Sequence, residues 1–181
     1  VLAAQPTQVE NQQAWQEFRP LGVILAVMPW NFPYWQVLRG AAGMLLAGNT
    51  YVLKHAPNVM GCASLLQDVM NTVGFPEGTF ELLNVTNEGV SSLIKDPRVA
   101  AVAVTGSVGA GAAIASQAGA ALKKTVLELG GSDPFIVLAD ADLDEAVKAA
   151  VAGRYQNTGQ VCMAAKRFII EAPVAAEFEA R

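Results

Sequence analysis

The sequence predicts an α/β protein built on a doubly wound parallel sheet. Five short apolar segments alternate with helical patterns, and Gly or Pro residues separate most of them. Hydrophobic residues make up 52% of the 181 residues and charged residues only 15%, so a substantial core is expected. These two observations favour parallel strands joined by helices that cover both faces of the sheet.

The elements are expected in regular order along the chain. The first strand, 21–28, is a continuous apolar run that Pro29 ends, which is typical of a strand buried on both faces. A helix stopped by Gly48 follows it. The same reasoning predicts strands over 50–53, 80–85, 99–104 and 125–129, and helices over 36–47, 61–73, 88–95 and 109–119.

The segment 130–134, Gly-Gly-Ser-Asp-Pro, breaks this alternation and is the expected domain boundary. One domain then spans 20–130, and 131–181 begins another; the polar segment 1–19 is expected to be the end of an upstream element. The second part should contain strands over 135–138 and 167–170, a helix over 143–151 with Asp142 as its N-cap, and the start of a further helix at the chain end.

Composition excludes several classes of function. The net charge is −4 and no basic stripe is visible, so no nucleic-acid partner is expected. No uninterrupted apolar run reaches the ~18 residues of a membrane span. Two distant cysteines form neither a disulfide framework nor a metal site, which favours a reducing, cytoplasmic setting. The chain begins at Val1 rather than Met, so the lack of a signal peptide carries little weight.

Cys162 is the residue around which the functional prediction is organised. It follows a Gly-Gln-Val loop, and such a loop entering a helix leaves backbone N–H groups that favour a thiolate and hold a developing oxyanion. The alternative is a small buried hydrophobe, the commoner state of a free cysteine. His55 is the only histidine, so the base that assists a nucleophilic Cys162 is expected to be a carboxylate.

Two polar side chains stand out in apolar surroundings. Asn31, between Pro29 and Pro33, offers a restrained NH₂ donor that suits an oxyanion; the alternative is an ordinary proline-rich turn. Glu128 lies inside an apolar strand, where the protonated carboxyl is favoured, and this suits a general base. The alternative for Glu128 is a structural glutamate in a salt bridge.

Two further features point to a phosphate-bearing ligand. The segment 105–111, Thr-Gly-Ser-Val-Gly-Ala-Gly, follows a strand and opens a helix, so its backbone could approach a pyrophosphate. It departs from the standard G-x-G-x-x-G pattern, and close helix–sheet packing is the alternative. Lys54 ends a strand where it could contact a ribose or phosphate, or simply be solvated.

Taken together, these motifs resemble the aldehyde dehydrogenase superfamily from about Arg19 to the chain end. The resemblance implies a Rossmann-like cofactor domain over 20–130 and the start of an α/β catalytic domain over 131–181. Family members are well over twice this length and are homo-oligomers. The chain is therefore expected to be a fragment that by itself binds dinucleotide poorly and lacks turnover. The motifs, in order, are 29–33 (Pro-Trp-Asn-Phe-Pro), Lys54, 105–107 (Thr-Gly-Ser), 128–131 (Glu-Leu-Gly-Gly) and 157–162 (Asn-Thr-Gly-Gln-Val-Cys).

The resemblance also implies the catalytic roles. Cys162 would attack the aldehyde, and the Asn31 side chain and the Cys162 backbone N–H would hold the oxyanion, a donor worth ~3 kcal/mol of barrier. Hydride transfer to the nicotinamide would leave a thioester on Cys162. Glu128 would activate the water that hydrolyses it, which favours a free acid over an acyl-coenzyme A product.

For the cofactor, the resemblance implies NAD or NADP, with Lys54 at the adenosine ribose and Ser107 at the pyrophosphate. NAD-preferring members carry a glutamate where this chain has Pro57, so no carboxylate repels a 2′-phosphate and relaxed or dual specificity is expected. The other implied cofactor contacts are Met28, Pro29, Trp30, Gly89, Thr105, Gly106, Ala110 and Leu129.

Within the superfamily the chain is most similar to bacterial succinate-semialdehyde dehydrogenases. Arg39, eight positions after Asn31, stands where semialdehyde-specific members grip the substrate carboxylate, and Trp35 is a second implied substrate contact. The alternative for Arg39 is a surface arginine. Gln156 departs from the pattern, because some of these enzymes have a second arginine there. Another aldehyde specificity, or a non-catalytic dinucleotide-binding module, therefore remains an alternative.

Overall fold

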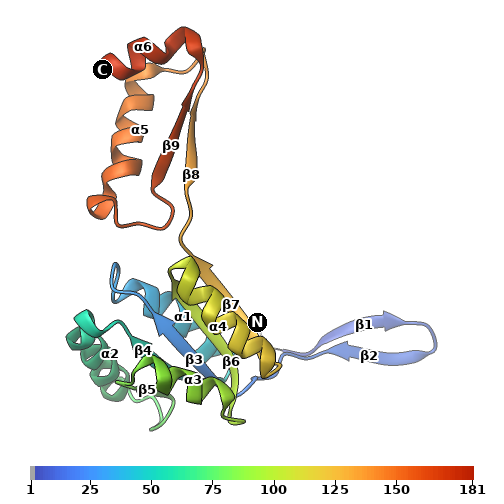
Figure 1. Ribbon diagram of the computed structural model, residues 1–181. Helices are drawn as coiled ribbons and strands as arrows, with labels where there is room; N and C mark the ends of the chain where they lie inside the picture. The colour runs from blue at the N-terminus through green and yellow to red at the C-terminus, as the bar shows by residue number, and fades with distance from the viewer. Residues whose placement is uncertain (1–2) are drawn as a thin grey trace. The chain divides into compact units, whose positions relative to one another are not determined.

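The computed structural model describes residues 3–181 and divides them into two compact units (Figure 1). The first unit comprises residues 3–128 and the second unit residues 129–181. The division falls close to the boundary expected after Gly130. Residues 1 and 2, part of the segment expected to end an upstream element, lie outside the described residues.

A five-stranded sheet forms the centre of the first unit, in the order β5-β4-β3-β6-β7. β3 pairs in parallel with both β4 and β6, and β4 pairs in parallel with β5. This confirms the predicted α/β class with a parallel central sheet. The strands are β3 (Val23–Met28), β4 (Thr50–His55), β5 (Phe80–Leu82), β6 (Val99–Gly106) and β7 (Lys124–Leu129).

Two pairs of helices cover the sheet, one pair on each face, because the central strands bury side chains on both sides. Ile24, Ala26 and Met28 of β3 face a cluster that includes residues of α1 and α2. Leu25 faces a second cluster with residues of α3 and α4. The helices are α1 (Trp35–Leu46), α2 (Met60–Thr72, after the 3₁₀ turn η1, Pro57–Val59), α3 (Asn87–Lys95) and α4 (Val108–Ala120).

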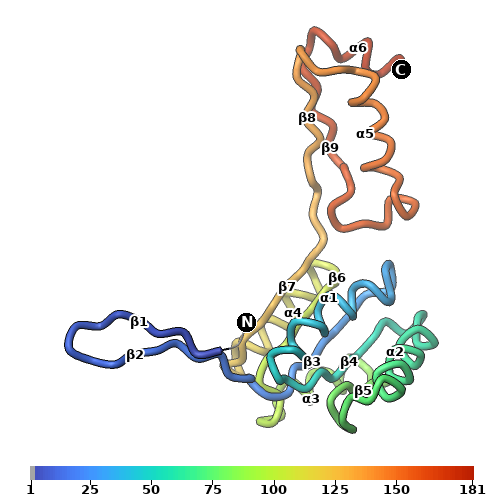
Figure 2. Tube along the Cα trace, turned by 180° about the vertical axis from the view of Figure 1, so that it is seen from behind, coloured from blue at the N-terminus to red at the C-terminus, as the bar shows by residue number. Residues whose placement is uncertain are grey.

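The polar N-terminal segment forms a two-stranded antiparallel hairpin, which the sequence did not predict (Figures 1 and 2). β1 (Gln5–Val9) and β2 (Gln12–Gln16) are almost entirely exposed. The turn between them contains Asn11, whose φ of 60° is in the left-handed region that Asn tolerates. Cross-strand backbone hydrogen bonds, not burial, therefore define this hairpin.

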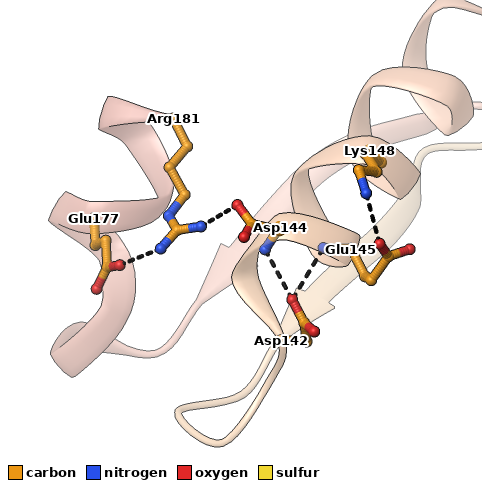
Figure 3. A network of polar contacts seen from close by, with 6 residues as sticks. All are labelled: Asp142, Asp144, Glu145, Lys148, Glu177 and Arg181. Carbon is orange, nitrogen blue, oxygen red and sulfur yellow. Dashed lines mark hydrogen bonds and ion pairs between the residues drawn. The ribbon is translucent and has the colours of Figure 1, made fainter.

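The second unit is a βαβ arrangement followed by a terminal helix. β8 (Asp133–Val137) and β9 (Ala165–Ile170) pair in parallel, with α5 (Leu143–Tyr155) between them and α6 (Ala172–Ala180) at the end. Asp142 is the N-cap of α5, as predicted, and its Oδ1 accepts from the backbone N–H groups of Asp144 (3.0 Å) and Glu145 (3.2 Å). Figure 3 shows this cap beside the Lys148–Glu145 pair.

Arg181 joins the two helices of the second unit. Its guanidinium pairs with Asp144 near the start of α5 and with Glu177 of α6, at 2.6 Å from the Glu177 carboxylate (Figure 3). Among residues 3–181, no helix is long and apolar enough to cross a membrane.

Candidate active site

The loops that carry two of the predicted motifs follow neighbouring strands. β3 and β6 lie side by side in the sheet although β4 and β5 separate them in the sequence, so the strand order reverses between them. The loop 29–33 follows β3, and the segment Thr105–Ser107 ends β6 and leads into α4. Ligands of open α/β sheets bind in the crevice at such a reversal, beyond the carboxyl ends of the strands.

A cleft of about 320 Å³ in the first unit brings together four of the predicted site residues, Met28, Arg39, Thr105 and Glu128. Gln36, Gly40, Gly43 and Met44 of α1 form one wall of the cleft, and Ala103, Val104 and Val126 line it further. Two cofactor candidates, one substrate candidate and the candidate base therefore share one concave site. Concave sites with a few polar groups are typical of small-molecule binding.

Arg39 and Glu128 face each other in this cleft. An Arg39 guanidinium nitrogen lies 3.8 Å from Glu128 Oε2, and the two side chains are 42% and 52% exposed. Arg39 also donates to the side-chain oxygen of Gln36 at 3.4 Å. The expectation of an apolar environment for Glu128 is therefore wrong within this chain: the strand is apolar in sequence, but β7 is an edge strand with exposed side chains.

A buried tyrosine lies behind the cleft. The Tyr51 side chain is fully buried, and its ring stacks on Phe80 with centroids 5.6 Å apart. A Cβ at Gly40 would lie 3.2 Å from the Tyr51 hydroxyl, so the glycine lets α1 approach it. Burial raises the pKa of Tyr51 above its usual range, while the charge of Arg39 acts in the opposite direction. Tyr51 therefore serves packing and is not set up as an acid or base.

The Thr-Gly-Ser segment opens α4 as predicted. Ser107 is the N-cap of α4, and its Oγ accepts from the backbone N–H of Ala110 at 3.2 Å. A Cβ at Gly106 would meet no atom of the described residues within 4 Å, so the space beside this backbone is open. The cap uses the Ala110 N–H; the other first-turn N–H groups and the positive dipole end of this helix favour a phosphate.

Lys54 and Gly89 belong to the sheet face that α3 and α4 cover. Lys54 alternates with Leu53 and His55 along β4, and Val52, two residues earlier, contacts the cluster on that face. Gly89 lies in the first turn of α3, and its backbone N–H donates to the Thr86 side chain that caps the helix (3.3 Å). A Cβ at Gly89 would lie 2.8 Å from Val85, so only glycine fits there without a shift.

The remaining candidates of the first unit lie around the loop after β3. Asn31 and Pro29 are half-buried, whereas Trp30 and Trp35 are 46% and 63% exposed. The loop leads directly into α1, and the backbone N–H of Gln36 donates to the carbonyl of Phe32 at 3.0 Å. Leu129, at the end of β7, belongs to the second unit.

Cys162 lies in a turn of the second unit that leads into strand β9. The apolar run after Cys162 forms the strand that was predicted over 167–170, and it pairs with β8. The expectation that the Gly-Gln-Val loop enters a helix at Cys162 is therefore wrong. Cys162 is exposed, while Val161 and Ala164 on either side are buried and fix the turn. The alternative of a small buried hydrophobe is wrong as well, and the thiol is accessible.

The backbone before Cys162 is strained. Asn157, Thr158 and Gly159 have φ values of 49°, 57° and 76°, and a β-branched residue such as threonine rarely adopts this region. A Cβ at Gly159 would lie 2.5 Å from a guanidinium nitrogen of Arg154 in α5, so a larger residue would not fit there without a shift. Strain of this kind persists where the surrounding structure fixes a functional loop.

Sequence reasoning missed two residues that hold the candidate segments. The Lys166 ammonium donates to the carbonyl oxygens of Cys162 (2.9 Å) and Gly131 (2.6 Å), so it ties the cysteine turn to the segment after β7. His55 is buried and contacts the loop after β3. Only the alternation of buried residues along β4 could have indicated His55, and no local pattern indicated Lys166.

Comparison with known proteins agrees with this arrangement. The sequence model of the aldehyde dehydrogenase family matches residues 3–181. The chain belongs to the aldehyde dehydrogenase family. It is 70% identical over 181 residues to the Escherichia coli succinate semialdehyde dehydrogenase [NAD(P)+] Sad, covering all of this chain and 39% of that protein. It is 56% identical over 177 residues to a probable NADP(+) succinate-semialdehyde dehydrogenase of Synechocystis, covering 98% and 39%.

Solved structures share the fold. A structure of Gox0499 superposes with a TM-score of 0.96 at 51% identity, covering 99% of this chain and 39% of that one. The succinic semialdehyde dehydrogenase of Streptococcus pyogenes, solved with NADP+, superposes with a TM-score of 0.95 at 42% identity and the same coverage. The chain thus spans about two fifths of the length of the relatives it matches.

Proposed function

We propose that this chain is the cofactor-binding part and the thiol-bearing start of the catalytic part of an NAD(P)+-dependent enzyme that oxidises succinate semialdehyde to succinate. The observation that carries the proposal is the cleft that Met28, Arg39, Thr105 and Glu128 share at the carboxyl edge of the sheet. The 70% identity to the Escherichia coli enzyme supports the same substrate. In this proposal residues 20–130 bind the dinucleotide and residues 131–181 begin the catalytic domain.

The first unit would hold the cofactor. The N-terminus of α4, with Thr105, Gly106, Ser107 and Ala110, would bind the pyrophosphate, because the helix dipole and the first-turn N–H groups that the Ser107 cap does not use favour an anion. Lys54 would reach the adenosine ribose. Met28, Pro29, Trp30, Gly89 and Leu129 would complete the contacts. The bound nicotinamide supplies a hydride acceptor.

The chain's own side chains would perform the covalent steps. The Cys162 thiolate attacks the aldehyde carbon, and the carbonyl electron pair moves to oxygen, where the Asn31 side-chain NH₂ and the Cys162 backbone N–H stabilise it. Collapse of this thiohemiacetal releases a hydride and leaves a thioester on Cys162. Glu128 takes a proton from water, the hydroxide attacks the thioester, and the thiolate leaves with succinate as the acid product.

Arg39 would select the substrate. Its guanidinium lies 3.8 Å from Glu128 and 3.4 Å from the Gln36 oxygen, contacts too long and too exposed to satisfy it fully. A substrate carboxylate can therefore compete for the fork of Arg39, and a bidentate ion pair is its strongest geometry. Trp35, at the start of α1 and exposed, would border the same substrate.

Pro57 supports relaxed cofactor choice. It begins the 3₁₀ turn η1 that follows β4, so no carboxylate stands at the position where one would repel a 2′-phosphate. We expect kcat/KM values for NAD+ and NADP+ within about 100-fold of each other, a difference below ~3 kcal/mol. Both cysteines are free thiols, which supports a reducing, cytoplasmic setting, and the full-length enzyme would act as a homo-oligomer on a small aldehyde.

A chimera tests the substrate. This chain replaces the matching 39% of the Escherichia coli Sad protein, which supplies the remaining segments. We expect NAD(P)H formation with succinate semialdehyde, and we expect Arg39→Gln to raise its KM about 10- to 100-fold with little change for butanal, which lacks the carboxylate. Equal losses for both aldehydes would contradict the role of Arg39, and a chimera without turnover would favour a non-catalytic dinucleotide-binding module.

A further inference from the structure

His55, the only histidine of the chain, is 1% exposed at the end of β4. Its Nε2 lies 2.9 Å from the carbonyl oxygen of Pro33, and its Nδ1 lies 3.3 Å from that of Met28. These two carbonyls are the last of β3 and the last of the loop 29–33. The imidazole therefore contacts both ends of the loop that carries Asn31.

The two shorter contacts, at 2.9 Å each, favour one tautomer, in which Nδ1 does not donate to the Met28 carbonyl at 3.3 Å. The backbone N–H of Ala56 donates to Nδ1 at 2.9 Å, so Nδ1 carries a lone pair and not a proton. Nε2 then carries the proton and donates to Pro33. The opposite tautomer would set a lone pair on Nε2 against the Pro33 oxygen and a proton on Nδ1 against the Ala56 N–H.

Two other features restrain the loop backbone. The Gln36 backbone N–H holds the Phe32 carbonyl at 3.0 Å, and the two prolines restrict the backbone. Neither of these fixes the Pro33 carbonyl, which the imidazole reaches. Asn31 stands between β3 and this anchor, so a shift at Pro33 moves the backbone from which its side chain extends.

We propose that His55 is a positioning residue, and that its Nε2–H to Pro33 hydrogen bond sets the Asn31 amide for its role at the oxyanion. This inference rests on the proposed function for the role of Asn31, but the holding of the loop by His55 stands on its own geometry. His55 touches neither substrate nor cofactor in this proposal.

Two substitutions separate the two sides of the imidazole. In His55→Asn the amide oxygen can take the place of Nδ1 and accept from Ala56, but the side chain is too short to reach Pro33. In His55→Gln the amide NH₂ can take the place of Nε2 and donate to Pro33. A role in packing alone predicts that both variants lose activity in proportion to lost stability.

Asn49 provides a matched control at the opposite end of the same strands. It is also buried, and its Oδ1 accepts from the backbone N–H groups of Leu21 (2.7 Å) and Gly22 (3.1 Å). Asn49→Ala therefore removes buried hydrogen bonds near the start of β3 and leaves the loop 29–33 untouched.

The first measurements need no turnover. In the ¹⁵N-labelled 181-residue chain, the single imidazole should give one protonated nitrogen, assigned to Nε2, and one unprotonated Nδ1. Hydrogen exchange should rise over residues 30–32 in His55→Asn, and near residues 21–22 but not in the loop in Asn49→Ala. A protonated Nδ1, an averaged imidazole spectrum, or unchanged exchange in the loop would overturn the inference.

The kinetic measurement uses the chimera described above. We expect His55→Asn to lower kcat about 100-fold with the KM for NAD(P)+ changed less than about threefold, because misplacing a catalytic group costs rate. His55→Gln should recover about tenfold of that loss, and Asn49→Ala should stay within about twofold of the parent. A kcat that follows the melting temperature across the three variants would overturn the inference. A parent chimera without turnover would contradict the proposed function. The hydrogen-exchange and tautomer measurements would still decide whether His55 holds the loop.

Discussion

The first and second units differ in where their apolar side chains lie. In the first unit the central strands bury apolar residues on both faces of the sheet, and Leu25 and Leu53 are fully buried. In the second unit the buried apolar residues are few and mostly small, namely Val137, Leu143, Ala150, Val161, Ala164 and Ala165. Ile136, Leu138 and Ile169 of the same unit are half exposed or more. Local hydrogen bonds and ion pairs are therefore expected to contribute a larger share of the stability of the second unit.

The chemical groups divide in the same way. The amide of Asn31, the carboxylate of Glu128 and the Arg39 guanidinium belong to the well-buried first unit, and the Cys162 thiol belongs to the second. The thiol sits in an exposed turn that follows the strained backbone at 157–159, and Lys166 donates to the Cys162 carbonyl. The first three groups therefore project from a unit with a large buried core, whereas a hydrogen bond from Lys166 to the Cys162 carbonyl restrains the turn that carries the thiol.

The largest expected effect is on turnover, from a substitution in the second unit that should leave stability unchanged. Cys162→Ala in the chimera should lower turnover by at least about 10³-fold, because no other thiol lies near this turn in the sequence. The residue is exposed, so the free energy of unfolding should change by less than about 0.5 kcal/mol. NAD(P)H formation and urea denaturation measure the two quantities; retained turnover would remove the nucleophile role.

The next effect concerns Glu128 of the first unit, the proposed base. Glu128→Gln should slow hydrolysis of the thioester about 100-fold or more, since a general base contributes at least that much, while acylation continues. Intact mass spectrometry of the chimera after mixing with succinate semialdehyde and NAD+ should then detect one succinyl group on the protein. Gln36→Ala is the control, because it removes another side chain of the same cleft. Normal deacylation in Glu128→Gln would contradict the assignment.

A matched pair of leucines compares the cores directly. Leu25→Ala, at a fully buried position, should lower the free energy of unfolding by about 2–5 kcal/mol. Leu138→Ala, at a position 53% exposed in the second unit, should cost less than about 1 kcal/mol. Urea unfolding of the 181-residue chain measures both, with tryptophan fluorescence for the first unit, which holds all three tryptophans, and circular dichroism for the whole chain. Equal losses of unfolding free energy in Leu25→Ala and Leu138→Ala would contradict the difference between the two cores.

The smallest effect concerns the local contacts of the second unit. Asp142→Ala removes the acceptor for two backbone N–H groups of α5 and should cost about 1 kcal/mol. Lys148→Ala, the control, breaks an ion pair whose partners are about 70% exposed and should cost less than about 0.5 kcal/mol. Circular dichroism on urea titration checks both, and a larger cost for Lys148→Ala would show that exposed charge, not capping, orders α5.

The sequence alone was sufficient for the order and type of the main elements. The apolar run that Pro29 ends became β3, Gly48 follows the end of α1, and Asp142 caps α5. Such features act within a few residues, so they can be recognised without knowledge of the fold. The hairpin over 5–16 escaped prediction, because its strands lack the apolar alternation that reveals a half-buried strand.

Only the tertiary structure decided how the candidate residues are placed. It showed Glu128 exposed on an edge strand, the Cys162 thiol exposed, and Arg39 within reach of Glu128. It also showed that His55 contacts the Pro33 carbonyl, 22 residues earlier in the chain, and that Lys166 donates to the Gly131 carbonyl, 35 residues earlier. Exposure and long-range hydrogen bonds depend on which strands become neighbours, and that choice is made by the packing of the whole sheet and not by any one segment.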